Sequence, residues 1–396
     1  MKKLLIVFLL ISMTGMVYAE EKMKDLVDGN TSFALDLYKS FCKQDGNIFF
    51  SPYSISTALA MTYGGARGDT AREMADALHF PFSQDSLHPA FSELRAHFIK
   101  IQKDKKIILN IANALWAQKD YEFDQKFLDL TKKYYDAGLF PLDFARDPDK
   151  SRITINEWVE KKTESKIKDL LKEGHVTELT RLVLTNAIYF LGTWNEVFDP
   201  DNTRDRAFWL TPEYKKEVPM MFQKEYFNYR EFPEHQVLEM MYKGFEVSMV
   251  IILPKKIDGL PQLESQLSRD TIQEWTSGLT SKKVLVFFPK FKMTQEFSLQ
   301  DVLQGLGMNL AFTFSADFSG IEPKKELHIS NVIHKAFIEV DEKGTEAAAA
   351  TAIAMELAAM MEPEPEFKAD HPFLFLIKDK LTGSILFMGR VSDPSN

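Results

Sequence analysis

Residues 341–367, DEKGTEAAAATAIAMELAAMMEPEPEF, fit two different secondary structures. Alanine, glutamate, methionine and leucine are strong helix formers, and the apolar residues from 353 to 361 recur with helical spacing. The segment also alternates, because every second position from 347 to 357 is apolar apart from one threonine, while both nearby glutamates fall on the other face. The pattern alone leaves a helix and a strand with one buried face both open.

The rest of the chain combines helix and strand patterns. We expect helices over residues 31–43, 51–66, 69–80 and 147–171, with Ser51 and Asp69 as N-caps. Strand patterns dominate the second half, over residues 181–194, 245–254, 283–293, 334–344, 371–379 and 383–391. Because these strands do not alternate strictly with helices, the sequence predicts a mixed α+β fold.

Net charge and cysteine count limit the partners and the covalent cross-links expected of this chain. The 396 residues carry a net charge of −9, which gives no reason to expect nucleic acid or an anionic membrane as a partner. Cys42 is the only cysteine, so no internal disulfide can form. It lies in an apolar helical pattern, and we interpret it as a buried structural thiol.

The N-terminus has the three parts of a secretory signal peptide. Lys2 and Lys3 precede an apolar run, and Val17 and Ala19 place small residues before Glu20. The run is too short and too interrupted for a membrane anchor. We therefore expect a signal peptide over residues 1–19, cleavage before Glu20, and a secreted or periplasmic mature protein.

The sequence lacks the usual local signatures of an enzyme. It contains no HExxH motif, no Cys/His metal spacing, no GxSxG elbow and no P-loop, so we expect neither a metal nor another cofactor. A catalytic triad need not be local in sequence, but nothing here favours one. The basic residues Lys100, Lys103, Lys105 and Lys106 are interpreted as a solvated helix end rather than a polyanion site.

Several blocks of the sequence together resemble one family. The segment EKGTEAAAAT (342–351) is similar to the proximal hinge of the serpins, the serine-protease-inhibitor superfamily. The blocks 47–74, 182–194 and 329–347 resemble serpin helices and strands in the family's order. The resemblance covers residues 20–396 and implies a single domain with three β-sheets, about eight or nine helices and an exposed reactive-centre loop at about 342–367. One departure is Ser165, where the family usually has glycine, on what we expect to be a surface helix.

The resemblance implies an inhibitor, not an enzyme. A target serine protease would cleave the loop and form a covalent acyl-enzyme, and the freed loop would then insert as a strand of the main sheet. This selects the strand interpretation of residues 341–367. The protein would be a monomer able to form loop–sheet polymers. The alternative within the family is a non-inhibitory carrier, chaperone or storage protein, whose hinge often carries bulky or charged residues.

The resemblance also assigns residues to three sites. The hinge comprises Glu342, Gly344, Thr345, Glu346, Ala347, Ala348, Ala349 and Ala350, whose small side chains suit passage between two strands. A polar cluster that gates sheet opening, called the shutter, comprises Ser51, Ser54, Asn186 and His334. The point where insertion begins, called the breach, comprises Trp194, Lys290 and Glu342, with an expected Lys290–Glu342 ion pair.

The family's spacing places the cleaved bond between Ala358 and Ala359. A small residue before the cut suits an elastase-like protease, whereas Leu357, Met360 or Met361 would suit a chymotrypsin-like protease if the register moves. No arginine or lysine occurs from residue 346 to 366, so trypsin-like targets are disfavoured.

Overall fold

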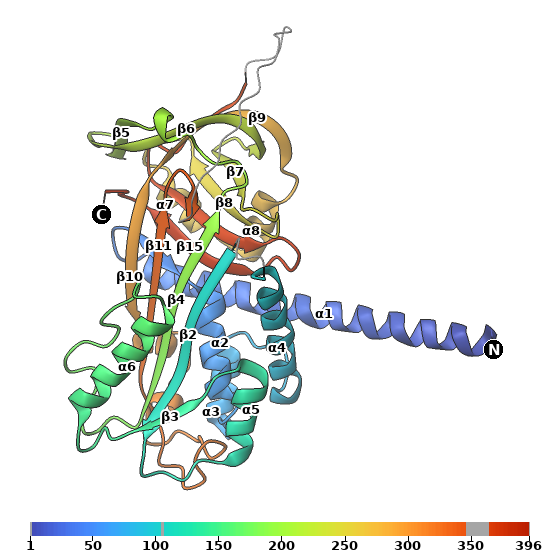
Figure 1. Ribbon diagram of the computed structural model, residues 1–396, viewed down its shortest axis with the longest axis vertical. Helices are drawn as coiled ribbons and strands as arrows, with labels where there is room; N and C mark the ends of the chain where they lie inside the picture. Colours follow the sequence, from blue (N-terminus) through green and yellow to red (C-terminus); the bar gives the residue numbers. More distant parts are fainter. Residues whose placement is uncertain (1, 104–106, 346–363, 396) are drawn as a thin grey trace.

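The computed structural model describes residues 2–103, 107–345 and 364–395, with side chains from residue 21 onward (Figure 1). These residues form a mixed α+β fold, which confirms the fold class. The described α-helices are α1 Lys2–Phe41, α2 Pro52–Tyr63, α3 Gly68–Ala77, α4 Gln84–Ile101, α5 Gln125–Tyr135, α6 Pro148–Lys162, α7 Leu260–Ser265, α8 Arg269–Thr276 and α9 Gln300–Gly305. No helix among them is long and apolar enough to cross a membrane.

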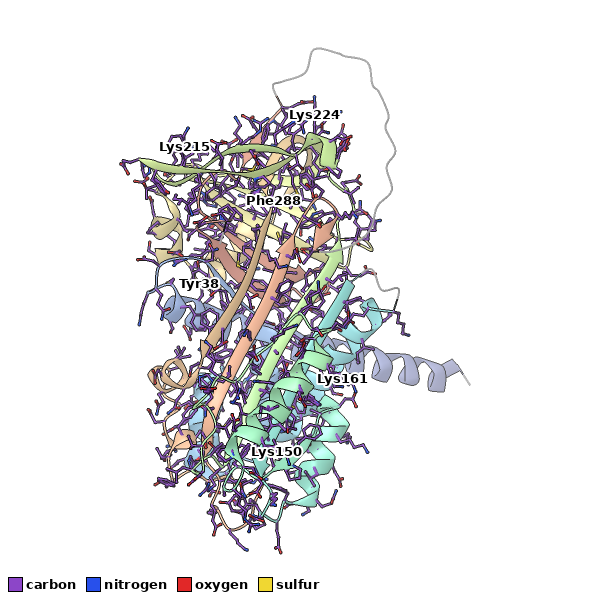
Figure 2. The ribbon with its side chains drawn as sticks, turned by 60° about the vertical axis from the view of Figure 1, so that its left-hand side comes forward. Tyr38, Lys150, Lys161, Lys215, Lys224 and Phe288 are labelled. Atoms are coloured by element: carbon purple, nitrogen blue, oxygen red, sulfur yellow. The ribbon has the colours of Figure 1, made fainter. Side chains whose placement is uncertain are left out.

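A six-stranded sheet forms the centre of the molecule. Its order is β10–β11–β4–β2–β3, with β12 paired to β4. The strands are β10 Phe291–Ser298, β11 Ile329–Val340, β4 Leu182–Thr193, β2 Ile107–Gln118, β3 Leu139–Leu142 and β12 Gly344–Thr345. Helix α6, which carries Lys150 and Lys161, lies across one face (Figure 2), and α2 packs on the opposite face. Burial on both faces explains why β4 is a continuous apolar run.

The second sheet has nine strands in the order β1–β15–β14–β8–β7–β6–β9–β13, with β5 paired to β6. Its strands are β1 Ile48–Phe50, β5 Arg204–Thr211, β6 Tyr214–Glu231, β7 His235–Met241, β8 Val247–Pro254, β9 Thr280–Pro289, β13 Glu366–Lys368, β14 Phe373–Asp379 and β15 Ile385–Val391. The resemblance implies three sheets. Here two of them are hydrogen-bonded into one, because the 18-residue β6 pairs β5 near its start and β7 near its end.

Three expected helices differ from the structure. The helix expected over 31–43 is only the last part of α1, which begins at Lys2 and ends at Phe41. The helix expected over 147–171 ends at Lys162, because Thr163 accepts a hydrogen bond from the Ile167 amide and Asn156 bonds the backbone of Leu171, which satisfies this segment without a helix. Ser165 therefore lies beyond the helix, with φ +60°, a conformation that suits glycine. Asp69 is not an N-cap, since α3 begins at Gly68 and Asp69 pairs with Arg72 in the first turn. Ser51, in contrast, caps α2.

Residues 283–293 are two strands rather than one. Strand β9 ends at Pro289, β10 begins at Phe291, and the two belong to different sheets. Proline lacks the amide hydrogen that a continuous ladder needs, so it marks the end of β9. Lys290 is consequently left at the junction between the two sheets, next to the first residue of β10.

Cys42 is partly rather than fully buried, because it follows the last residue of α1. Burial raises the pKa of its thiol above the ordinary value. Helix α1 runs continuously past Ala19 and Glu20, the residues between which cleavage is expected (Figure 1).

Candidate functional site

The two strands between which an inserted strand would enter are hydrogen-bonded directly to each other. Strands β11 and β4 run parallel, with partners from Ile329 and Leu182 at one end to Phe337 and Tyr189 at the other. Beyond Tyr189, β4 changes partner, and Thr193 and Gly192 pair with β12 instead. The central sheet is therefore closed along most of β4 and begins to separate at one end.

A buried polar cluster spans the closed part of the sheet. His334, Asn186 and Asn113 occupy matching positions on β11, β4 and β2, so they form a row across three adjacent strands. His334 Nδ1 bonds Asn186 Oδ1, and the Asn186 amide donates to Asn113 Oδ1 and, at 2.6 Å, to Ser54 Oγ. The Ser51 amide donates to His334 Nε2 at 3.1 Å. The structure thus brings all four expected shutter residues together and adds Asn113.

This cluster requires a neutral histidine. Because His334 Nε2 accepts a hydrogen bond from Ser51, the proton lies on Nδ1 and is donated to Asn186. Burial lowers the pKa of His334 to about 3. Opening β11 from β4 would break the His334–Asn186 bond, so the cluster holds the sheet closed.

The hinge begins with a tight turn. Asp341 and Gly344 exchange backbone hydrogen bonds, and Asp341 Oδ1 accepts from the Lys343 and Gly344 amides. Gly344 has φ +144°, and a Cβ there would lie 2.2 Å from the carbonyl oxygen of Gly192. Only glycine fits this conformation and this close approach.

Thr345 already lies within the central sheet. It pairs with Gly192 of β4, is fully buried, and its hydroxyl lies 3.1 Å from the Tyr242 hydroxyl. A small β-branched side chain fits this space beside Tyr242. The next expected hinge residues, Glu346 to Ala350, lie outside the described residues.

Trp194 connects the end of β4 to the hinge. Its ring stacks on Tyr242 with a centroid distance of 4.5 Å and an interplanar angle of 13°. Its indole nitrogen donates to the Asp341 carbonyl at 3.1 Å, and its amide donates to the Lys343 carbonyl at 2.9 Å. The backbone position of the hinge therefore depends on this tryptophan.

The expected ion pair at the base of the loop is present. Lys290 Nζ lies 2.8 Å from Glu342 Oε2, and Thr203 donates to Glu342 Oε1 at 2.8 Å. Burial alone would raise the pKa of Glu342, but the hydrogen bonds from Lys290 and Thr203 help to hold it below its ordinary value. Glu342 is mostly buried whereas Lys290 is partly exposed. The lysine therefore neutralises a carboxylate that is largely shielded from solvent.

The far end of the loop joins the other sheet. The Pro365 carbonyl accepts a hydrogen bond from the Leu285 amide, and Glu364 pairs with Lys224 at 2.6 Å. Strand β13 pairs with β9 in parallel at the edge of the sheet. The expected cleavage site at Ala358–Ala359 and its alternatives lie outside the described residues, as do Lys105 and Lys106 of the basic cluster. Lys100 lies in the last turn of α4.

Comparison with known proteins identifies the family. The serpin (serine protease inhibitor) family profile matches residues 28–394. The chain is 44% identical over 382 residues to the leukocyte elastase inhibitor of Bos taurus, covering 94% of this chain and all of that protein. The chain therefore belongs to the serpin family, and it is an inhibitor-type protein rather than an enzyme.

Solved structures agree with this assignment. The chain resembles a highly specific serpin of the insect Tenebrio molitor with a TM-score of 0.84 and 34% identity, over 93% of this chain and 98% of that one. It also resembles human thyroxine-binding globulin, with a TM-score of 0.85 and 32% identity, over 94% and 99% of the two chains. The serpin fold is thereby confirmed.

Proposed function

We propose that this protein is a suicide-substrate inhibitor of serine proteases. The observation that carries the proposal is the position of Gly344 and Thr345, which pair with β4 where β11 and β4 separate. A cleaved loop continuing from Thr345 would extend β12 along β4 and displace β11 pair by pair. Each new backbone hydrogen bond contributes a net ~0.5–1.5 kcal/mol, and each apolar side chain that becomes fully buried about 1.5–3 kcal/mol.

The proposed reaction begins as ordinary proteolysis. The protease serine attacks the Ala358 carbonyl, the amine of Ala359 leaves, and an ester joins the protease to Ala358. Insertion then carries the ester-linked protease across the inhibitor and distorts its active site before water reaches the ester. Until cleavage, the closed β11–β4 pairing and the row of His334, Asn186 and Asn113 keep the loop out, so the native state is kinetically trapped.

An elastase-like protease is the proposed target. Ala358 presents a small side chain to the specificity pocket, and no basic residue lies nearby. The bovine relative at 44% identity is a leukocyte elastase inhibitor. The proposal includes export, for which the support is the signal-peptide pattern of residues 1–19. N-terminal sequencing of the exported protein tests it; an intact Met1 would contradict it.

Incubation with elastase tests the inhibitory function. We expect a covalent complex that survives SDS, and a released C-terminal fragment that begins at Ala359. The matched control is Thr345→Arg, which places a long charged side chain in the buried site beside Tyr242. This variant should be cleaved at the same bond but yield little complex. Cleavage of the wild-type chain without any complex would instead favour a non-inhibitory serpin.

A further inference from the structure

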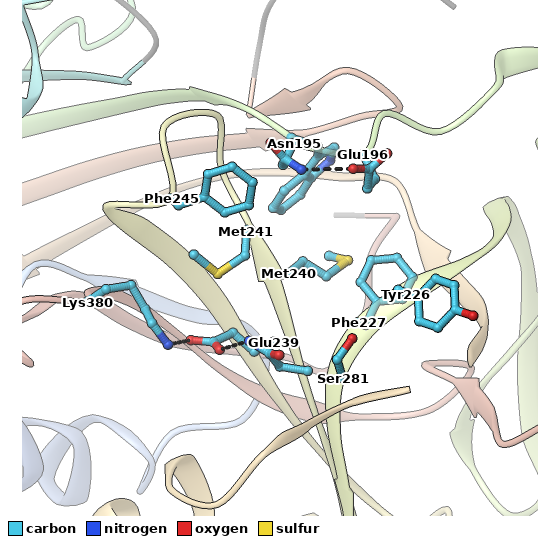
Figure 3. Close-up of a pocket in the computed structure, with 12 residues that line it drawn as sticks. Asn195, Glu196, Tyr226, Phe227, Glu239, Met240, Met241, Phe245, Ser281 and Lys380 are labelled. Atoms are coloured by element: carbon cyan, nitrogen blue, oxygen red, sulfur yellow. Dashed lines mark hydrogen bonds and ion pairs between the residues drawn. The ribbon is translucent and has the colours of Figure 1, made fainter. Parts of the chain in front are cut away.

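A cavity of about 470 Å³ lies beside the breach (Figure 3). Strands β6, β7 and β9, the β7–β8 turn and the segment after β4 contribute its lining. Six of the lining side chains are aromatic or contain sulfur: Trp194, Tyr226, Phe227, Met240, Met241 and Phe245. The volume, and the mixture of apolar side chains with polar and charged groups, are compatible with a site for a small molecule.

The two carboxylates that line this cavity differ in whether a cation neutralises them. Lys380 pairs with Glu239 at 2.5 Å, and Glu239 also accepts hydrogen bonds from Asn228 and Ser248. Glu196 accepts only the side-chain amide of Asn195, at 2.8 Å, and no cation among the described residues pairs with it. The cavity therefore offers a ligand one unneutralised charge, which is negative.

Phe245 is held over the cavity in a strained conformation. It has φ +65°, which is rare for a bulky residue, and follows Gly244 at φ +101°. Its side chain remains 58% exposed, as does that of Tyr226. Backbone strain that gains little packing in the free protein is typical of ligand sites. The two rings would be covered by a ligand that entered between them and the floor of the cavity.

We propose that the cavity binds a small organic cation, a primary ammonium group on an aromatic or branched aliphatic body. Glu196 would pair with the ammonium group, and the aromatic rings would attract the cation through their faces while burying the apolar body. An anion would meet Glu196 and Glu239, and the one lysine in the lining is already paired. The charge pattern thus selects cations over neutral and anionic molecules of the same shape.

Ligand binding here would be coupled to the hinge. Trp194 lines the cavity and donates to the carbonyls of Asp341 and Lys343, and the adjacent Asn195 amide donates to Met241, also a lining residue. A ligand that favours this arrangement would stabilise the hinge as it stands and slow further insertion. The coupling rests on the proposed inhibitory function; the binding itself does not.

Calorimetric titration of the full chain with three probes of one shape tests the binding. We expect 2-phenylethylammonium to bind more tightly than 2-phenylethanol, and 3-phenylpropanoate to bind least. Glu196→Gln should weaken the ammonium probe about fivefold, and Phe245→Ala about threefold. The matched control Glu225→Gln, on exposed β6 surface outside the lining, should leave affinity unchanged.

Absence of heat with the ammonium probe at millimolar concentration would overturn the proposal, as would equal affinity for all three probes or an unaffected Glu196→Gln variant. The coupling has a separate measurement, the fraction of elastase trapped as complex at saturating probe. We expect that fraction to fall. Tight probe binding with an unchanged fraction of trapped elastase would refute the coupling alone. If no elastase complex forms even without the probe, the inhibitory function is refuted, but the result of the calorimetric titration is not affected.

Discussion

Glycine at position 344 meets two requirements that no other residue meets together. Its φ of +144° disfavours side chains, and the backbone of residues 192–194 lies where a Cβ would be. The resemblance to the serpin hinge predicted a small residue here. It could not predict the close approach to Gly192, because that contact joins residues about 150 positions apart.

Gly344→Ala should therefore displace β12 from β4. We expect less complex with elastase and more simple cleavage, since insertion would start from a displaced hinge. Gly305→Ala is the matched control, because no atom lies within 4 Å of a Cβ built at Gly305. Equal complex yields from the two variants, measured on denaturing gels, would show that the β12 contact is not needed.

Glu342 offers a second test at this scale. In Glu342→Lys, two cations would meet where Lys290 and a mostly buried carboxylate now pair at 2.8 Å. The loss of the pair and the Thr203 bond should cost about 1–3 kcal/mol and release the base of the loop. We expect polymers or premature insertion on native gels and by size-exclusion chromatography.

The control is Glu339→Lys, which reverses the charge of a more exposed carboxylate on β11 whose lysine partner is 3.4 Å away. It should remain monomeric. A Glu342→Lys variant with the same monomer yield as this control would contradict the assigned role of the ion pair.

Among the elements, the pairing of β11 with β4 would have to break for the proposed insertion, and we expect a fall in pH to weaken this pairing through His334. Its folded pKa of about 3 lies below the ordinary value of 6.5, so the unfolded state binds more protons between these values. The stabilisation is complete above about pH 6.5 and is lost progressively as the pH falls toward 3. By pH 5 the loss from this one group is about 2 kcal/mol.

We accordingly expect polymerisation on mild heating to accelerate between pH 7 and pH 5, and His334→Gln to reduce that acceleration. His235→Gln is the control, since burial also lowers the pKa of His235 to about 4 but this residue lies on β7, outside the central sheet. Polymerisation is followed by light scattering. An equal pH dependence of its rate in wild type and in His334→Gln would show that the cluster does not control sheet opening.

Some of these helices and strands were predicted from the sequence, and others were not. Continuous apolar patterns predicted β4, and the caps predicted α2. Strand β2 was not predicted, and with it Asn113 was missed, although the asparagines Asn110 and Asn113 within a mostly apolar run could have indicated it. Strands β9 and β10 were merged because the sequence pattern cannot show that the chain passes from one sheet to another at Pro289.

At the scale of the whole molecule, the proposed mechanism requires a metastable native state. The family resemblance predicted the fold and the grouping of the shutter and breach residues, which local patterns could not, since His334 and Asn186 are 148 positions apart. Hydrogen bonds such as that from Thr203 to Glu342 were inaccessible to sequence reasoning, because they depend on how the two sheets meet.

The most direct test of loop insertion is the unfolding temperature of the intact chain and of the same chain nicked once within residues 346–363. Insertion of the freed loop between β11 and β4 would add a fully paired strand to the centre of the sheet. We expect the nicked chain to unfold about 10 °C or more above the intact one, as a gain of several kcal/mol requires. An equal or lower unfolding temperature after nicking would contradict the account.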